Sequence, residues 1–147
     1  MTPQQQLDAF MAKYTPEIRS LAKAAIAKMR KRLPGATQLV YDNYNALVVG
    51  FGPSEHASEA VFSIALYPRW VTLFFLRGAE LPDPEKVLRG GGKIVRSVVL
   101  NDAKDLDKPS IRSLMDAALA RAPIDGGKRG RLVIRSVSAK QRPRRPR

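Results

Sequence analysis

At 147 residues the chain is long enough to bury one sizeable hydrophobic core and too short for two ordinary domains. The absence of cysteine excludes disulfides, thiolate catalysis and cysteine-ligated zinc or iron–sulfur sites. The formal net charge is +13, but nine basic and no acidic residues fall in 128–147, which leaves 17 basic against 13 acidic residues before that segment. The basicity therefore belongs mostly to the C-terminal segment.

No stretch of the sequence approaches the roughly 18 to 20 apolar residues of a membrane span. The first residues, MTPQQQLDAFMAKY, also lack the charged region and apolar stretch of a secretory leader. We therefore expect a cytoplasmic protein. The 11 prolines and 10 glycines favour many short elements, and hence a mixed α and β structure.

Two helices are predicted at the N-terminus. Residues 4–14 carry apolar side chains at spacings of three and four, as on one face of a helix. Thr15-Pro16 is typical of a helix cap followed by a first-turn proline, and the amphipathic helix that starts there should end at Pro34-Gly35. The cations at 28–32 suit the negative end of that helix.

The centre of the chain is predicted to form a sheet, because short apolar stretches are bounded there by Gly, Pro, Asn and Asp. The expected strands are 37–41, 45–51, 61–67, 70–76 and 93–100. Such spacing favours an antiparallel meander. The strand that contains TLFF is apolar on both faces, so each side of the sheet is expected to meet something. Helices would cover one side, and a homodimer partner would explain the other.

A third helix is predicted after Asn101. Asp107 with Pro109 is expected to cap and open it, and Ala122-Pro123 to end it. The glycines at 126, 127 and 130 then mark a flexible joint.

The last residues are predicted to be an extension of the domain. LVIRSV at 132–137 has the composition of a strand that could add to a sheet edge, and the residues beyond Ser138 are expected to be disordered when free. The chain thus divides into an α+β domain at 1–122 and a basic extension at 123–147. In the domain, two N-terminal helices and one C-terminal helix should pack on an antiparallel sheet of about five strands.

Four stretches, taken in order, resemble the YdhG-like domain family, a domain family of unknown function. They are DAFMAKYTPEIRSLAKAAIAKMRKRLPGA, LVYDNYNALVVGFG, IALYPRWVTLFFLRGAELPDP and GGGKIVRSVVLNDAKDLDKPSIRSLMDAALARA, and together they cover most of residues 5–122. The resemblance implies an α+β fold somewhat like frataxin, with helices packed on an antiparallel sheet. It implies no reaction.

One branch of that family is described as a frataxin-like iron chaperone. In frataxin-like proteins an acidic helix ridge donates iron, and hard cations do prefer clustered carboxylates. The first two predicted helices offer only Asp8 and Glu17 as carboxylates. Against these stand seven cations: Lys13, Arg19, Lys23, Lys28, Arg30, Lys31 and Arg32. This surface should repel iron.

The stretch YDNYN at 41–45 allows two interpretations. The first is a hairpin turn, with Asp42-Asn43 tolerating the positive φ of a tight turn. The second is the rim of a binding site, since such sites combine apolar walls with a few convergent polar groups. Its residues would be Tyr41, Asp42, Tyr44 and Asn45, completed by Arg69 and Trp70.

Other loops carry weaker signals. RGGGK at 89–93 lacks the spacing of a phosphate-binding loop and is followed by a strand, although Lys93 and Arg96 could attract an anion. His56, the only histidine, has two flexible carboxylates nearby and makes a poor metal site. No nucleophile, histidine and acid can be grouped, so the sequence supports neither catalysis nor a cofactor.

The C-terminal arginines are the clearest physical signal of function, because cations without neighbouring carboxylates bind polyanions through counterion release. No aromatic residue is interleaved among them for base stacking. Solubilising or protein-docking roles also fit such a segment. The residues that would contact nucleic acid are Arg131, Arg135, Lys140, Arg142, Arg144, Arg145 and Arg147.

Three hypotheses for function follow. The first is a non-catalytic binding module that presents its aromatic and polar sheet rim to a small ligand or a protein partner. The second is an accessory protein that binds nucleic acid through the basic tail. The third is a frataxin-like iron carrier.

Overall fold

The structure, a computed structural model, describes residues 1–147 and has the predicted α+β class. Its helices are α1 (Pro3–Met11), α2 (Pro16–Arg32) and α3 (Pro109–Arg121), with short 3₁₀ turns η1 (Ala57–Glu59), η2 (Gly78–Glu80) and η3 (Ala103–Asp107). The strands are β1 (Thr37–Asp42), β2 (Leu47–Gly52), β3 (Phe62–Leu66), β4 (Val71–Phe75), β5 (Arg96–Leu100) and β6 (Leu132–Val137). No helix is both long enough and apolar enough to span a membrane.

The sheet has six strands in the order β5-β4-β3-β2-β1-β6, not about five as predicted. The first five strands form the expected antiparallel meander. The sixth is the segment at 132–137, which adds to the edge of the sheet and runs parallel to β1. A parallel neighbour needs a long return connection, and the chain supplies one through α3 and residues 122–131.

The helix boundaries follow local capping chemistry, with one exception. The hydroxyl of Thr15 caps α2 as predicted, by accepting a hydrogen bond from the Ile18 backbone N–H. Asp107, however, does not cap α3. It ends η3 and pairs with Lys28 at 2.6 Å and Arg32 at 2.8 Å. The hydrogen bond from the Lys28 ammonium holds the pKa of the Asp107 carboxyl below its usual value.

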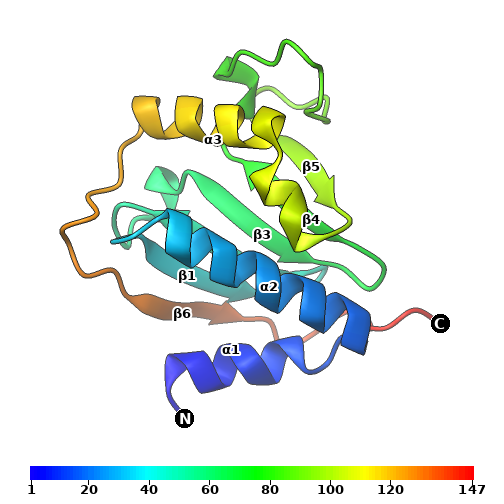
Figure 1. Cartoon of the computed structure of the whole chain (residues 1–147). Helices are drawn as coiled ribbons and strands as arrows, with labels where there is room; N and C mark the ends of the chain where they lie inside the picture. Colours follow the sequence, from blue (N-terminus) through cyan, green and yellow to red (C-terminus); the bar gives the residue numbers. More distant parts are fainter.

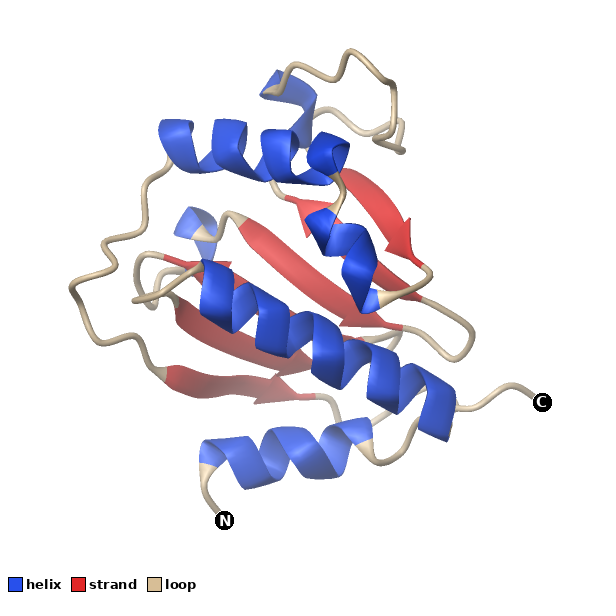
Figure 2. Ribbon diagram, viewed as in Figure 1, coloured by secondary structure: helices blue, strands red, loops and turns tan.

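All three helices lie on the same side of the sheet (Figure 1; Figure 2). Paired positions such as Val49, Ile64 and Leu73 point to that side and are fully buried in the core. On the other face Phe74 is half-buried, and Val99 is 48% exposed. Within this chain a layer of helices covers one face only, although Ala65 and Thr72 on the other face are also buried.

Two glycines allow the segment after α3 to cross the corner between α2 and β1. Gly35 has φ +84°, and a Cβ on it would lie 2.1 Å from the carbonyl oxygen of Asp125. A Cβ on Gly130 would lie 2.0 Å from the carbonyl oxygen of Ala36. This close backbone approach directs β6 along β1, where α1 packs against it (Figure 1).

The residues beyond Ser138 are not disordered, contrary to the prediction. They continue from the end of β6 past the β1–β2 turn and are hydrogen-bonded to it as far as Arg144. Residues 138–147, called the tail below, are thus bound to the domain as far as Arg145, and the last residues project at the edge of the molecule (Figure 1).

We expect Gly35→Ala to lower the free energy of unfolding by more than about 1 kcal/mol, because a side chain at positive φ is strained and its Cβ would strike the Asp125 backbone. Urea denaturation would measure this loss. Gly91→Ala is the matched control, since nothing lies within 4 Å of a Cβ there, and it should change stability by less than about 0.5 kcal/mol. Equal stabilities of the two variants would contradict the close crossing.

Candidate functional site

The β1–β2 connection is a hairpin turn, which confirms the first interpretation of YDNYN. The Asn43 backbone N–H donates to the Ala46 carbonyl oxygen at 2.9 Å, and Asp42 pairs with Leu47 across the strands. The expected positive φ is absent, because Lys86 is the only non-glycine residue with a positive φ. The carbonyl groups of the turn point instead to the tail.

Asp42 and Arg144 form a buried ion pair. Arg144 Nη2 lies 2.9 Å from Asp42 Oδ1, and the two residues are 6% and 0% exposed. The same guanidinium donates to the carbonyl oxygens of Asn43 at 2.5 Å and Tyr44 at 3.4 Å. A buried charge is tolerated only with such partners, so the pair holds the tail on the turn.

The buried side chain of Tyr14 packs against Arg144 of this pair. Its hydroxyl donates to the Leu66 carbonyl oxygen and accepts from the Leu47 backbone N–H, both at 3.1 Å. The Arg144 guanidinium carbon lies 5.7 Å from the centre of the Tyr14 ring, within the range of a cation–π contact. Burial raises the pKa of Tyr14 to about 12. Tyr14 therefore connects the tail to two strands of the sheet.

The backbone of the tail is also held. Ser138 N–H donates to the Asp42 carbonyl oxygen at 2.8 Å, and Arg142 N–H donates to that of Tyr44 at 2.9 Å. Arg145 Nε reaches the Lys13 carbonyl oxygen at 3.2 Å, at the corner between α1 and α2. The tail consequently has a defined path from β6 toward the β3–β4 turn.

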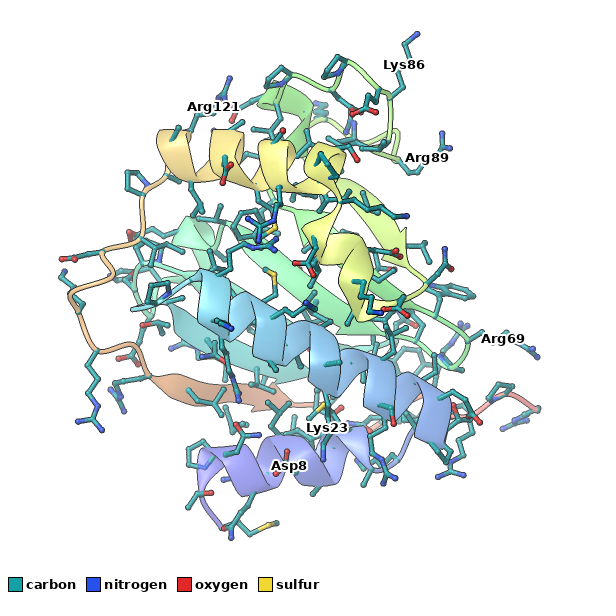
Figure 3. The ribbon with its side chains drawn as sticks, in the orientation of Figure 1. Asp8, Lys23, Arg69, Lys86, Arg89 and Arg121 are labelled. Atoms are coloured by element: carbon teal, nitrogen blue, oxygen red, sulfur yellow. The ribbon has the colours of Figure 1, made fainter.

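At that turn the tail completes a shallow cleft of about 740 Å³. Four of its ten lining residues are arginines and none is acidic. Arg69 projects from the β3–β4 turn on the side of the molecule where the tail ends (Figure 3). The lining residues are Asn45, Tyr67, Pro68, Arg69, Trp70, Arg142, Pro143, Arg145, Pro146 and Arg147.

Aromatic rings lie among these arginines. The ring centres of Tyr67 and Trp70 are 5.5 Å apart with planes at 30°, and burial raises the pKa of the Tyr67 phenol. Trp70 remains 45% exposed. The Arg142 guanidinium lies 5.8 Å from the ring centre of Tyr44, which is 47% exposed. The tertiary structure thus interleaves aromatics with arginines where the linear sequence of the tail does not.

The structure gathers some predicted site residues and separates others. Asn45, Arg69 and Trp70, expected at the sheet rim, lie together with Arg142, Arg145 and Arg147 from the tail, and Tyr44 is adjacent. Asp42 and Arg144 pair with each other below the surface, so neither offers its charge to a ligand, although Arg144 Nε has no hydrogen-bond partner.

The remaining predicted residues lie outside the cleft. Tyr41 is half-buried within β1, and Arg131 is paired with Glu55 at 2.9 Å. Arg96 stands opposite Phe75, at the end of the sheet farthest from Trp70, and Lys93 is exposed in the loop before it. Arg135 and Lys140 are exposed on β6 and at the start of the tail.

Tyr67 and Tyr14 were not predicted as site residues. Tyr67 directly precedes Pro68-Arg69-Trp70, and a hairpin through these residues would have placed it opposite Trp70. Tyr14 continues an apolar helix stripe, and nothing in that pattern indicates a hydroxyl shared by two strands.

A second hollow, of about 750 Å³, lies at the other end of the sheet between η1, η2 and α3. Phe75 and Ala118 form part of its apolar wall. Arg77 and Glu80 on its rim neutralise each other at 2.9 Å. The charged side chains that line this hollow are balanced, whereas those that line the cleft are all cationic.

No three His, Cys, Asp or Glu side chains are arranged to hold a metal ion. No family model, no curated protein and no solved structure matches the chain. The resemblance to YdhG-like domains therefore stays a prediction.

We expect Asp42→Asn to lower the free energy of unfolding by about 3–5 kcal/mol, because it leaves the Arg144 guanidinium buried without a counter-charge. Replacing Arg144 as well, in Asp42→Asn/Arg144→Met, should restore part of that loss. Urea denaturation of both single variants and the double variant measures the coupling. Asp116→Asn, at an exposed carboxylate without an ion pair, is the control. Strictly additive effects would contradict the buried pair.

The raised pKa of Tyr14 predicts a stability that falls in alkaline solution. The unfolded chain loses this proton near pH 10 and the folded chain near pH 12, so the stabilisation is present below pH 10 and is lost as the pH rises through 12. The two-unit difference corresponds to roughly 2–3 kcal/mol. Tyr14→Phe should be less stable at neutral pH, because two hydrogen bonds are lost, yet should fall less steeply above pH 10. Identical slopes in urea denaturation would contradict the assignment.

Proposed function

We propose that this protein is a non-catalytic nucleic-acid-binding module, and that its binding site is the cleft between the tail and the β3–β4 turn. One observation carries the proposal. Docking of the tail places Arg142, Arg145 and Arg147 beside Arg69 in a cleft that no acidic side chain lines. Guanidinium groups donate several hydrogen bonds in a plane and suit phosphate oxygens.

The net charge of +13 supports a polyanionic partner. Long-range attraction speeds the encounter, and neutralised phosphates release their bound counterions. Contacts of this kind position a nucleic acid without reading its sequence. The cleft is thus suited to general affinity for a phosphate backbone.

The fixed path of the tail also favours this function. A disordered arginine segment would lose conformational freedom when it binds, and that loss would weaken the complex. Here the Asp42–Arg144 pair already orders the backbone around Arg142 and Arg145. The cationic side chains consequently begin close to the positions in which they would bind.

A small anionic molecule is the second candidate, because the cleft volume of about 740 Å³ lies within the range of small-molecule sites. The two candidates differ in their dependence on salt. A polyanion gives a steep salt dependence whose slope reports the number of phosphates contacted. A ligand with one phosphate gives a shallow one.

We expect labelled nucleic acid to bind with an affinity that falls steeply as salt rises, in a fluorescence anisotropy titration. Arg142→Gln/Arg145→Gln should reduce the slope of log K against log salt by roughly 1.4, since each phosphate contact contributes about 0.7 for single strands. Lys128→Gln/Arg129→Gln removes the same charge from exposed positions outside the cleft and should have a smaller effect. Equal effects of the two variants would contradict the cleft as the binding site.

A further inference from the structure

The indole of Trp70 is held in a way that leaves it available to a planar ligand. It lies at the entrance to β4 within the cleft, and the Tyr67 ring packs beside it at 5.5 Å. The Tyr67 N–H donates to the Trp70 carbonyl oxygen at 2.9 Å, which fixes the backbone of the turn. Despite these contacts 45% of the residue is exposed. Core packing does not explain an aromatic side chain that lies beside another ring and is left this exposed.

The groups around the indole restrict the chemistry of its partner. Its lining includes three prolines, which are stiff, and four arginines, and no acidic side chain. A ligand that satisfies both the indole and the guanidinium groups must combine a flat ring with repeated negative charge. A nucleotide chain has both features, whereas a base-free polyanion lacks the ring.

We propose that the cleft takes single-stranded nucleic acid, with one base stacked on Trp70 and the neighbouring phosphates on the arginines. This inference rests on the proposed function and adds the class of nucleic acid. In a duplex the faces of the bases are covered by their neighbours, so a base must leave the stack before it can contact an indole. A single strand presents these faces freely, and stacking on an aromatic side chain is largely independent of sequence.

A second planar surface lies close by. The Arg142 guanidinium is 5.8 Å from the centre of the exposed Tyr44 ring, and arginine planes also stack on bases. Asn45, which lines the cleft next to Tyr44 in the chain, presents an amide that both donates and accepts hydrogen bonds. The strand would therefore pass from Trp70 toward the β1–β2 turn, beneath the tail arginines.

The test uses the full chain and three probes: an oligothymidylate of roughly 12 nucleotides, a duplex of the same length, and inorganic polyphosphate. Trp70 is the only tryptophan, so its fluorescence reports directly on the cleft. The single strand should bind at least about tenfold more tightly than the duplex and should quench Trp70. Polyphosphate should bind without quenching.

Substitution of Trp70 distinguishes the contribution of base stacking to the affinity from that of charge. Trp70→Ala should weaken single-strand binding by roughly 5- to 100-fold and leave polyphosphate binding within about twofold, whereas Trp70→Phe should retain part of the affinity. Ile94→Ala is the control, because Ile94 is similarly exposed at 46% but lies in the loop before β5. It should leave every affinity unchanged. Circular dichroism would verify that each variant is folded.

Two results would overturn the inference, and they differ in meaning. Salt-dependent binding of all three probes with equal affinity, or equal quenching by polyphosphate, would exclude base stacking and leave the proposed function intact. No salt-dependent binding of any probe would exclude both.

Discussion

The ion pair between Asp42 and Arg144 determines where the tail lies, and the candidate site depends on it. Each charge would be costly to bury alone, so the end of β1 and the tail stabilise each other. The carbonyl groups of the β1–β2 turn and the Tyr14 ring also contact the guanidinium, while its Nε has no hydrogen-bond partner. The β1–β2 turn, which the sequence offered as the rim of a ligand site, instead binds the tail of the same chain.

Anchoring of one arginine gives the others different roles. Arg144 is buried and structural, whereas Arg142, Arg145 and Arg147 line the cleft and remain exposed. Burial thus divides a run of cations that looks uniform in the sequence into one structural residue and a set of exposed residues at the candidate site. The same arrangement brings those cations to Trp70, so that the two leading sequence hypotheses, a sheet-rim site and a basic tail, concern a single place on the molecule.

The two ends of the sheet differ in charge balance. At the end formed by the β1–β2 and β3–β4 turns, the arginines of the cleft have no acidic neighbours in its lining. At the opposite end, Arg77 and Glu80 neutralise each other at the rim of an apolar hollow. The helices cover only one face of the sheet. The second face carries Phe74 of β4 and Val99 of β5, and Trp70 directly precedes β4.

The sequence by itself determined the features that depend on neighbours along the chain. Apolar spacing and the Thr15-Pro16 cap located the first two helices, and short apolar stretches between turn residues located the five-stranded meander, because propensity and capping act over a few residues. Only the tertiary structure decided the partners of distant residues. Arg144 meets Asp42 from 102 positions away, Asp107 pairs with α2 rather than capping α3, and β6 lies parallel to β1. Local patterns carry no information about such pairings, since any buried carboxylate can accept any nearby cation and only the packed fold brings the two together.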